Sequence, residues 1–517
     1  MTHRIGRLTI TTLIATLAAG ACITGPAAGA VNLPPVLSSH MVLQRDMAVP
    51  IWGTAAAGEK VTVAFRQQTQ SAVADAQGKW LVKLAPLTAG GPDTLTVTAS
   101  NTNVLEDVLV GEVWVGSGQS NMQMPVASYT NGDAVLMTNA AGTYPQLRLL
   151  TSGGWVAGAP SNNVSFSALL FSFGQRLQQE LGVPVGLMVG AVGGTPSGYW
   201  LSEAAYRSDP ACQAVVAKFA KGYSFEQAQL QYTNALAAWE RAAANTNAGA
   251  AKPPKPIPPL RAGECQGKLG YLYEACIRPL MPQGIRGALW DQGESGTAIL
   301  GVDQYTLMGA LIKGWRQEWG EGDFPFLYVQ KPSGEGCAWD PADPVTCRAD
   351  KFEPLPPSPP ADGAYREEHI RIMRYPSTAM VTSSDLGPGT HPVNKSGYGA
   401  RTARVALGMV YGSQLEIYGP VYQSHVVEGN KIRIRFTHVG QGLACRPADK
   451  LQGFALAGAD KQFQWADATI DGDTVIVSSD KVPQPAAVRY GWSMRHPWAN
   501  LFNKDGLPAL PFRTDDW

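Results

Sequence analysis

The sequence carries no excess of charge of either sign. Its 517 residues include 41 Lys and Arg against 41 Asp and Glu, and charged residues make up only 16% of the chain. A protein that binds nucleic acid neutralises phosphates with clustered Lys and Arg, and no basic run of that kind occurs here. We therefore expect no nucleic acid among the partners of this protein.

Sequence motifs for metal ions are also missing. The sequence has no His-x-x-x-His pair, no cysteine cluster with zinc spacing and no acidic calcium-binding loop. Only 7 histidines and 7 cysteines are present in the whole chain. We predict that the protein has no metal site.

Long apolar stretches are confined to the N-terminus. Residues 8–19 are largely apolar, follow Arg4 and Arg7, and precede a small-residue segment that ends at Ala30. This pattern predicts a secretory signal peptide over residues 1–30. A second interpretation makes Cys22 a lipid-modified N-terminus, because residues 19–22 loosely resemble a lipoprotein cleavage site. No later run is long enough to span a bilayer, so we expect a secreted or periplasmic protein, soluble or lipid-anchored.

Export would place the cysteines beyond residue 30 in an oxidising compartment, where disulfides are allowed. Cys337 and Cys347 flank a short loop and are the pair that we expect to be joined. The remaining cysteines allow several pairings, with Cys212 and Cys265 the next candidates. The sequence alone leaves these other pairings open.

Glycine, proline and tryptophan are frequent, at 56, 38 and 14 residues, which is typical of a loop-rich and β-rich secreted protein. The length predicts two or three domains. Over residues 31–107, runs of β-forming residues alternate with Gly and Pro turns, which predicts an N-terminal β-sandwich-like domain. The clearest runs lie at residues 48–53, 60–65, 79–84 and 94–98.

Residues 108–411 follow a different pattern. Apolar strands alternate with helical stretches, which predicts a parallel, doubly wound α/β sheet. Insertions near residues 205–262 and 332–362 interrupt this domain, and residues 412–517 return to a β pattern that predicts a C-terminal β domain. The expected strands are 113–115, 185–189, 285–290 and 326–329, and the expected helices include 171–181, 225–244, 305–319 and 395–410.

Ser120 is the first candidate for chemistry. It lies in Gly118-Gln119-Ser120-Asn121-Met122, just past a buried strand, where a helix would begin. This position exposes a hydroxyl at the carboxyl edge of the sheet, and backbone N–H groups at a helix start stabilise negative charge. The sequence is not an α/β-hydrolase elbow, because Met122 replaces the second glycine. The alternative is a tight turn with a capping serine.

A serine nucleophile needs a base, and His391 is the best placed histidine because its loop opens a predicted helix. The alternative for His391 is a surface or capping role. Gly194 follows another strand, and glycine allows its N–H to approach an acyl oxygen closely. Gln292 follows a third strand and offers a side-chain amide. These segments are all predicted to meet at one edge of the sheet.

Four motifs carry a family resemblance. They are Gly118-Gln119-Ser120-Asn121-Met122, Gly193-Gly194-Thr195-Pro196, Gln292-Gly293-Glu294-Ser295 and His391-Pro392-Val393-Asn394-Lys395, with further matches at residues 38–46, 110–114, 183–187 and 488–492. With these motifs, nearly the whole mature chain resembles the sialate O-acetylesterases of the SGNH (GDSL-like) hydrolase superfamily. The resemblance implies a flavodoxin-like SGNH core with accessory β-sandwich domains.

The resemblance also implies roles for individual residues. Ser120 would be the nucleophile and His391 the base, with Ser120 N–H, Gly194 N–H and Gln292 as oxyanion donors. The implied reaction removes O-acetyl groups from sugars through an acetyl-serine intermediate and needs no cofactor. The implied substrate is an O-acetylated carbohydrate.

The sequence departs from the family at the third member of the triad. Many relatives carry an aspartate shortly before the histidine, where this chain has Pro388 and Gly389. Asp385 and Glu294 are alternative acids, and a Ser-His dyad held by a backbone carbonyl is a further alternative. Two other functions therefore stay open: an acetyl xylan esterase, and a non-catalytic carbohydrate-binding or scaffold protein with a vestigial site.

Overall fold

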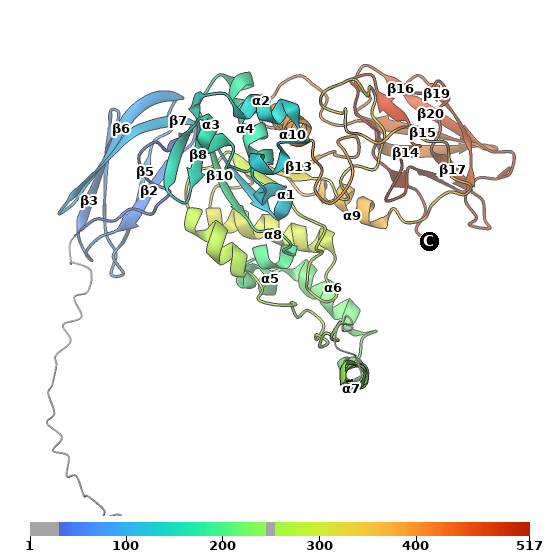
Figure 1. Ribbon diagram of the computed structural model, residues 1–517, viewed down its shortest axis with the longest axis horizontal. Helices are drawn as coiled ribbons and strands as arrows, with labels where there is room; N and C mark the ends of the chain where they lie inside the picture. The colour runs from blue at the N-terminus through green and yellow to red at the C-terminus, as the bar shows by residue number, and fades with distance from the viewer. Residues whose placement is uncertain (1–29, 245–253) are drawn as a thin grey trace, which may run out of the picture.

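The computed structural model describes residues 30–244 and 254–517. The predicted signal peptide, apart from Ala30, and the predicted lipidation site Cys22 therefore lie outside the described residues. Over the described ranges, no helix is both long and apolar enough to cross a membrane. Figure 1 shows an N-terminal group of strands at one end, a central α/β part, and a C-terminal group of strands at the other end.

The N-terminal strands form two facing sheets. β2 and β5 pair antiparallel, while β3 pairs with β4 and β6, and β1 pairs parallel with β7. The strands predicted at residues 48–53, 60–65 and 79–84 are confirmed, but β4 was missed because it buries none of its side chains. The bounds are β1 (Val42–Gln44), β2 (Val49–Thr54), β3 (Lys60–Phe65), β4 (Gln68–Val73), β5 (Lys79–Leu84) and β6 (Gly90–Thr98).

β7 joins the N-terminal strands to the central sheet. Its first half pairs with β6, and its second half lies between β10 and β11. The predicted domain limit at residue 107 falls inside this strand and stays a prediction. The central strands are β7 (Thr102–Gly118), β8 (Tyr144–Thr151), β9 (Gly154–Gly158), β10 (Val185–Ala191), β11 (Gly287–Asp291), β12 (Phe326–Val329) and β13 (Thr378–Val381).

The central sheet has the order β13-β12-β11-β7-β10-β8-β9, and all neighbours except β8 and β9 are parallel. The prediction of a mainly parallel α/β sheet flanked by antiparallel sheets is confirmed. The run β10-β7-β11-β12-β13 has the flavodoxin-like strand order, so the chain reverses direction across the sheet at β7. Ligands bind at the carboxyl ends of strands beside such a point.

Helices cover both faces of the sheet. In Figure 1, α4 and α10 lie on the upper side and α8 on the lower side. Gly116 of β7 allows the α4 side to pack closely, because a Cβ there would lie 2.8 Å from Leu170. On the other face, Trp290 of β11 packs edge-to-face on Trp315 of α8 and on Trp200. These aromatic contacts fix α8 against the sheet.

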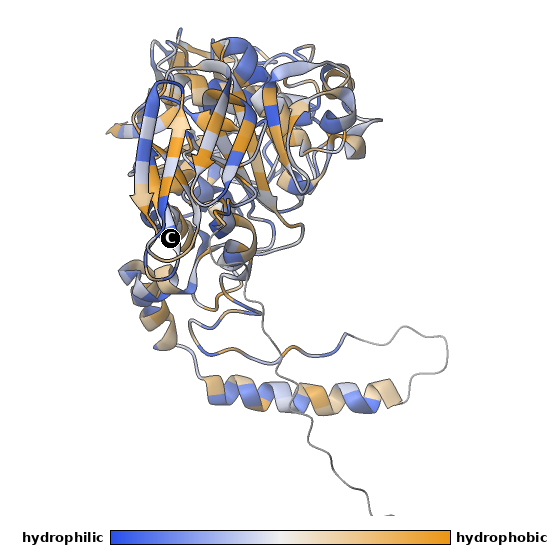
Figure 2. Ribbon diagram, turned by 90° about the vertical axis from the view of Figure 1, so that its left-hand side faces the viewer, coloured by the Kyte–Doolittle hydropathy of each residue, from blue (hydrophilic) through white to orange (hydrophobic). Residues whose placement is uncertain are grey.

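The helices begin and end as follows. They are α1 (Ser120–Gln123), α2 (Ala134–Ala140), α3 (Pro160–Asn163), α4 (Ala168–Leu181), α5 (Glu203–Ser208), α6 (Pro210–Ala220), α7 (Phe225–Ala244), α8 (Gln304–Trp319), α9 (Ala364–Ile372) and α10 (Lys395–Met409), with short turns η1 (Val126–Tyr129), η2 (Ser197–Trp200), η3 (Tyr273–Ile277) and η4 (Arg278–Leu280). α7 buries none of its residues and stands apart from the molecule in Figure 2.

The C-terminal strands have a hydrophobic core of their own, built around Ile432, Phe454, Val475 and Leu501. Segment 332–362 runs against this core, with Trp465 Nε1 donating to Pro356 O at 2.7 Å. The strands are β14 (Val421–Glu428), β15 (Lys431–Thr437), β16 (Leu443–Cys445), β17 (Phe454–Ala457), β18 (Gln464–Trp465), β19 (Asp467–Asp471), β20 (Thr474–Ser478), β21 (Ala487–Tyr490), β22 (Leu501–Asn503) and β23 (Phe512–Arg513).

The expected disulfide between Cys337 and Cys347 is not formed. All six cysteines of the described residues are free thiols, Cys212 and Cys265 included. The thiol of Cys337 is buried and lies 3.4 Å from Ala499 O, whereas Cys347 is exposed and its thiol faces Pro344 O. Two cysteines on either side of a short loop are therefore not enough to predict a disulfide, because here their side chains turn toward different segments.

Candidate active site

Three strands end at the same level on the carboxyl edge of the sheet. Gly118, the last residue of β7, pairs with Ala191 of β10 on one side and with Asp291 of β11 on the other. Gly118 has φ +124°, and a Cβ there would lie 2.1 Å from Asp291 O. Only glycine fits this approach. The turn after β7 therefore delivers Ser120, the first residue of α1, to this edge.

Ser120 and His391 meet at this edge. Ser120 Oγ lies 2.7 Å from His391 Nε2, although the two residues are 271 positions apart in the sequence. Ser120 is half-buried and His391 is exposed. The distance is that of a serine hydroxyl which can donate to an imidazole acting as base. The structure thus brings together the two residues that the sequence singled out.

Neither predicted acid contacts His391. Asp385 is buried and binds Arg401 through both carboxylate oxygens, at 2.8 and 3.1 Å. Glu294 pairs with Lys331 at 2.6 Å. Within residues 30–244 and 254–517, no carboxylate forms a hydrogen bond or ion pair with His391, so the observed arrangement is a Ser-His pair and not a Ser-His-acid triad.

Gly194 lies on the other side of Ser120. Gly194 has φ +71° and is exposed, and its N–H has no acceptor among the described residues. The preceding Gly193 is fixed because its N–H donates to Gln123 Oε1 at 2.7 Å, and a Cβ on Gly193 would lie 3.3 Å from Ser120 Cβ. The N–H of Ser120 also lacks an acceptor in the described part of the chain. Neither predicted backbone donor therefore has an acceptor within the described residues.

Gln292 differs from its predicted role as an oxyanion donor. Its amide nitrogen donates to Thr195 O at 3.3 Å and to Gly296 O at 3.2 Å, and its oxygen accepts from Gln304. The amide is buried and its hydrogens are used within the protein. Gln292 instead supports the loop that carries Gly194, because Thr195 is the next residue.

A cluster of buried charge lies behind Ser120, and the sequence analysis did not predict it as a cluster. Lys331 Nζ lies 2.7 Å from Asp291 Oδ1 and 2.6 Å from Glu294 Oε1. Lys331 follows β12, so the rule that polar residues after an apolar strand reach the carboxyl edge could have found it. Lys395 is also fully buried and donates to Asn121 Oδ1 at 2.7 Å.

The environment shifts the pKa values of these groups. Burial raises the pKa of Asp291, and Lys331 opposes this only in part. Burial acts to raise the pKa of Glu294 as well, but the charge of Lys331 lowers it overall. Burial acts to lower the pKa of Lys331, but the two carboxylates raise it. Burial lowers the pKa of Lys395 to about 7.

Side-chain amides connect the cluster to the nucleophile. Gln119 Nε2 donates to Glu294 Oε2, and Gln119 Oε1 accepts from Ser295 Oγ at 3.0 Å. Asn121 Nδ2 donates to Glu294 Oε1 at 3.1 Å and to Thr390 O at 2.8 Å. The residues on both sides of Ser120 are therefore anchored in the charge cluster.

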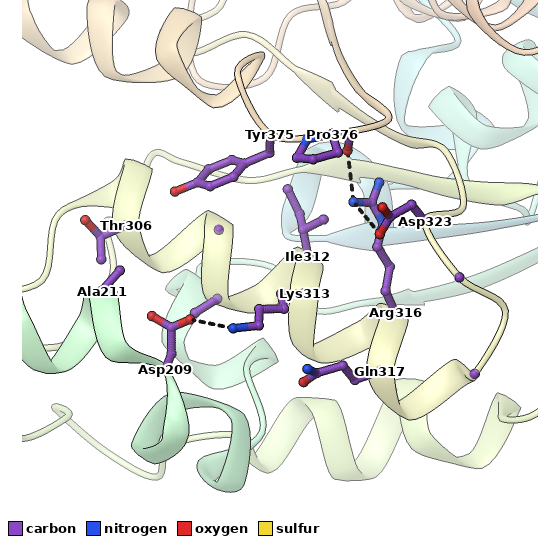
Figure 3. Close-up of a pocket in the computed structure, with 14 residues that line it drawn as sticks. Asp209, Ala211, Thr306, Ile312, Lys313, Arg316, Gln317, Asp323, Tyr375 and Pro376 are labelled. Carbon is purple, nitrogen blue, oxygen red and sulfur yellow. Dashed lines mark hydrogen bonds and ion pairs between the residues drawn. The ribbon is translucent and has the colours of Figure 1, made fainter.

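A separate hollow of about 600 Å³ lies along α8, away from this site (Figure 3). Its charged groups are satisfied within the protein: Lys313 Nζ lies 3.8 Å from Asp209, and Arg316 donates to Pro376 O at 2.9 Å. None of the residues that line it belongs to the Ser120 site. No group of three or more His, Cys, Asp or Glu side chains that could hold a metal ion occurs in the part of the chain that the structure describes.

Comparisons with known proteins agree with the fold. No protein-family model matches the chain. A carbohydrate acetylesterase from Xanthomonas citri of known structure is 32% identical, with a TM-score of 0.71, and the match covers 94% of this chain and 100% of that one. The fold and this similarity place the chain in the class of esterases.

Two mammalian proteins narrow the assignment. The sialate O-acetylesterase of Homo sapiens is 25% identical over 92% of this chain and 91% of its own. The sialate O-acetylesterase of Mus musculus is 26% identical over 92% of this chain and 93% of its own. The chain belongs to the sialate O-acetylesterase family.

Proposed function

We propose that this protein is an exported carbohydrate O-acetylesterase with an SGNH-type core, in which Ser120 is the nucleophile and His391 the general base. The observation that carries the proposal is the 2.7 Å contact between Ser120 Oγ and His391 Nε2. The free N–H groups of Ser120 and Gly194 on the same side of the sheet support it. The predicted signal peptide supports export.

The reaction follows from this geometry. His391 Nε2 takes the proton of Ser120 as Oγ bonds to the acetyl carbon, and the carbonyl oxygen becomes an oxyanion that accepts from the Ser120 and Gly194 N–H groups. The sugar oxygen leaves with the proton from His391. Water then attacks the acetyl-serine, with His391 as base again, and acetate leaves as Ser120 regains its proton. No cofactor enters this sequence.

The substrate class follows from the relatives. The neighbour of known structure is named as a carbohydrate acetylesterase, and the mammalian relatives as sialate O-acetylesterases. We assign O-acetylated sugars to this chain on that basis. Acetylated sialic acid and acetylated xylan are the two substrates to compare, and acetate release from mucin-type and xylan-type material under the same conditions separates them.

The test of the proposed function compares Ser120→Ala with a matched control, Ser128→Ala, at an exposed serine of η1 in the same segment. We expect Ser120→Ala to lower acetate release by about 10³-fold or more, because removing a serine nucleophile leaves only binding and oxyanion stabilisation. Ser128→Ala should keep wild-type activity. Equal activity in wild type and Ser120→Ala would overturn the proposal.

A second measurement addresses the non-catalytic alternative. The specific observation behind that alternative is that no carboxylate contacts His391 among the described residues. A fluorophosphonate probe reacts with an activated serine but not with an ordinary surface hydroxyl. We expect labelling of Ser120 in the wild type and its loss in His391→Ala. An unlabelled wild type that still binds acetylated glycans would favour the binding protein.

A further inference from the structure

Asn121 follows the nucleophile directly, and its buried side chain is bound by three different segments. Its Nδ2 donates to Thr390 O at 2.8 Å and to Glu294 Oε1 at 3.1 Å. Its Oδ1 accepts from Lys395 Nζ at 2.7 Å. The orientation of the amide is unambiguous, because the ammonium group only donates and the carbonyl and carboxylate oxygens only accept.

The carbonyl that Asn121 binds belongs to the residue before His391. The buried Asn394 closes this loop at its base, since its Nδ2 donates to Leu386 O at 3.1 Å. Between these ends, Pro388, Gly389 and Thr390 are exposed, and a Cβ on Gly389 would meet nothing within 4 Å. In a Ser-His-acid triad, the acid holds the imidazole in its working orientation. No carboxylate does this here within the described residues, so the imidazole depends on the position of its own backbone.

We propose that Asn121 is a positioning residue that fixes the His391 loop against Ser120, so that a side-chain amide bound to backbone orients the base where no acid does. The inference rests on the proposed function, because it gives Ser120 and His391 their catalytic roles. It concerns orientation alone: the amide carries no charge and does not stabilise an imidazolium as an acid does.

Lys395 supports Asn121 from the other side. Its ammonium group is fully buried and lies 5.1 Å from the ring centre of Tyr129 and 5.2 Å from that of Tyr398. Within the described residues, Asn121 Oδ1 is the one hydrogen-bond acceptor of this ammonium group. Burial lowers the pKa of Lys395 to about 7, so the protein keeps this group at a cost. Its observed contact is with the amide that holds the His391 loop.

The test is Asn121→Ala in the acetate-release assay with an acetylated sugar. We expect kcat to fall about 10- to 100-fold, because a misplaced base loses part of the rate enhancement that general-base catalysis provides. KM should change less than twofold, because Ser120 and Gly194 keep their places. A matched control, Asn162→Ala, removes a 2.9 Å hydrogen bond from a side-chain amide to a backbone carbonyl, that of Ala157, outside this network, and should keep kcat within twofold.

A double-mutant cycle separates positioning from general damage to the fold. If Asn121 acts through His391, Asn121→Ala should have no further effect on the residual activity of His391→Ala. Lys395→Met breaks the same connection from the other side; its loss of kcat should resemble that of Asn121→Ala, and the double variant should lose no more than either single variant. If Asn121→Ala does not fold, Lys395→Met decides the question with the same measurements.

Several outcomes would overturn the inference. These are a kcat of Asn121→Ala within twofold of wild type, equal losses in the His391→Ala and wild-type backgrounds, or a loss in Asn162→Ala as large as in Asn121→Ala. Ser120→Ala in the same assay tells this failure from that of the proposed function. If Ser120→Ala is inactive while Asn121→Ala equals wild type, only the positioning role fails; if Ser120→Ala is fully active, the proposed function fails.

Discussion

Two charge clusters lie at opposite edges of the central sheet, one around Glu112 of β7 and one behind Ser120. At the amino end, Glu112 binds Arg45 at 2.5 Å and Arg286 at 2.7 Å, and accepts further hydrogen bonds from Gln44 and Tyr411. At the carboxyl end, behind Ser120, Lys331 bridges two carboxylates. The part of β7 from Glu112 to Gly118 separates this first cluster from the candidate active site.

The two clusters differ in how well their charges are matched. At the amino end, Arg45 and Arg286 meet two carboxylates, because Asp46 lies 3.5 and 4.0 Å from them in addition to Glu112, and both arginines keep about a quarter of their side chains exposed, at 24% and 27%. At the carboxyl end, Asp291 and Glu294 share the single ammonium group of Lys331, at 2.7 and 2.6 Å. Burial without full pairing is costly. The comparison indicates that the charges at the carboxyl end lower the stability of the protein while they help to position Ser120 and His391.

Removing the shared lysine should have the largest effect. Lys331→Met leaves the buried Asp291 and the partly exposed Glu294 without their shared ammonium group, and we expect a loss of about 3–5 kcal/mol in the free energy of unfolding. Urea unfolding measures it. We also expect kcat to fall in the folded fraction, because Glu294 would no longer hold Asn121 as it does now. Unchanged stability would show that the carboxylates do not depend on Lys331.

The matching change at the amino end is Glu112→Gln. It leaves Arg45 and Arg286 with the exposed Asp46 as their carboxylate, and both reach solvent, so we expect a smaller loss of about 2 kcal/mol. The kcat of the folded enzyme should stay within twofold of wild type. A large loss of kcat here would remove the distinction between the two clusters.

The pH dependence of stability provides a test at the carboxyl end, through the buried His369. It lies against Gly293, where a Cβ would be 2.8 Å from His369 Nε2, and burial lowers its pKa to about 4. Between about pH 6.5 and pH 4 the unfolded chain binds a proton that the folded chain does not. Wild type should therefore lose about 3 kcal/mol as the pH falls through this window, relative to His369→Gln. Parallel stability curves for the two proteins would contradict this expectation.

The smallest effect should come from an exposed ion pair outside both clusters. Glu203 and Arg207 lie one turn apart on α5, 2.6 Å from each other, and both are exposed. Glu203→Gln should cost about 0.3–0.5 kcal/mol at most, because solvent screens such pairs. Thermal unfolding at low and high salt gives the measurement. If Glu203→Gln lowered stability more than Glu112→Gln does, burial would not determine how much these ion pairs stabilise the protein.

Much of the fold could be read from local patterns. The runs at residues 60–65, 185–189 and 326–329 became β3, β10 and β12, because apolar and β-branched segments of this length are buried as strands. The helix predicted at residues 225–244 became α7 with the same bounds. α9 was not predicted, since its charged segment has no clear apolar stripe.

The sequence by itself determined which residues reach the carboxyl edge. A buried strand followed by a glycine turn must present its next polar residue there, which placed Ser120 and Gly194, and a loop before a helix placed His391. These positions depend on neighbours a few residues away.

The tertiary structure decided the partners of those residues. It gave Asp385 to Arg401 and Glu294 to Lys331, turned Gln292 toward Thr195, and left Cys337 and Cys347 as free thiols. The bond between Lys395 and Asn121 spans 274 positions. Such contacts depend on how distant segments pack and on which charges they bury together, and no local pattern along the chain specifies this.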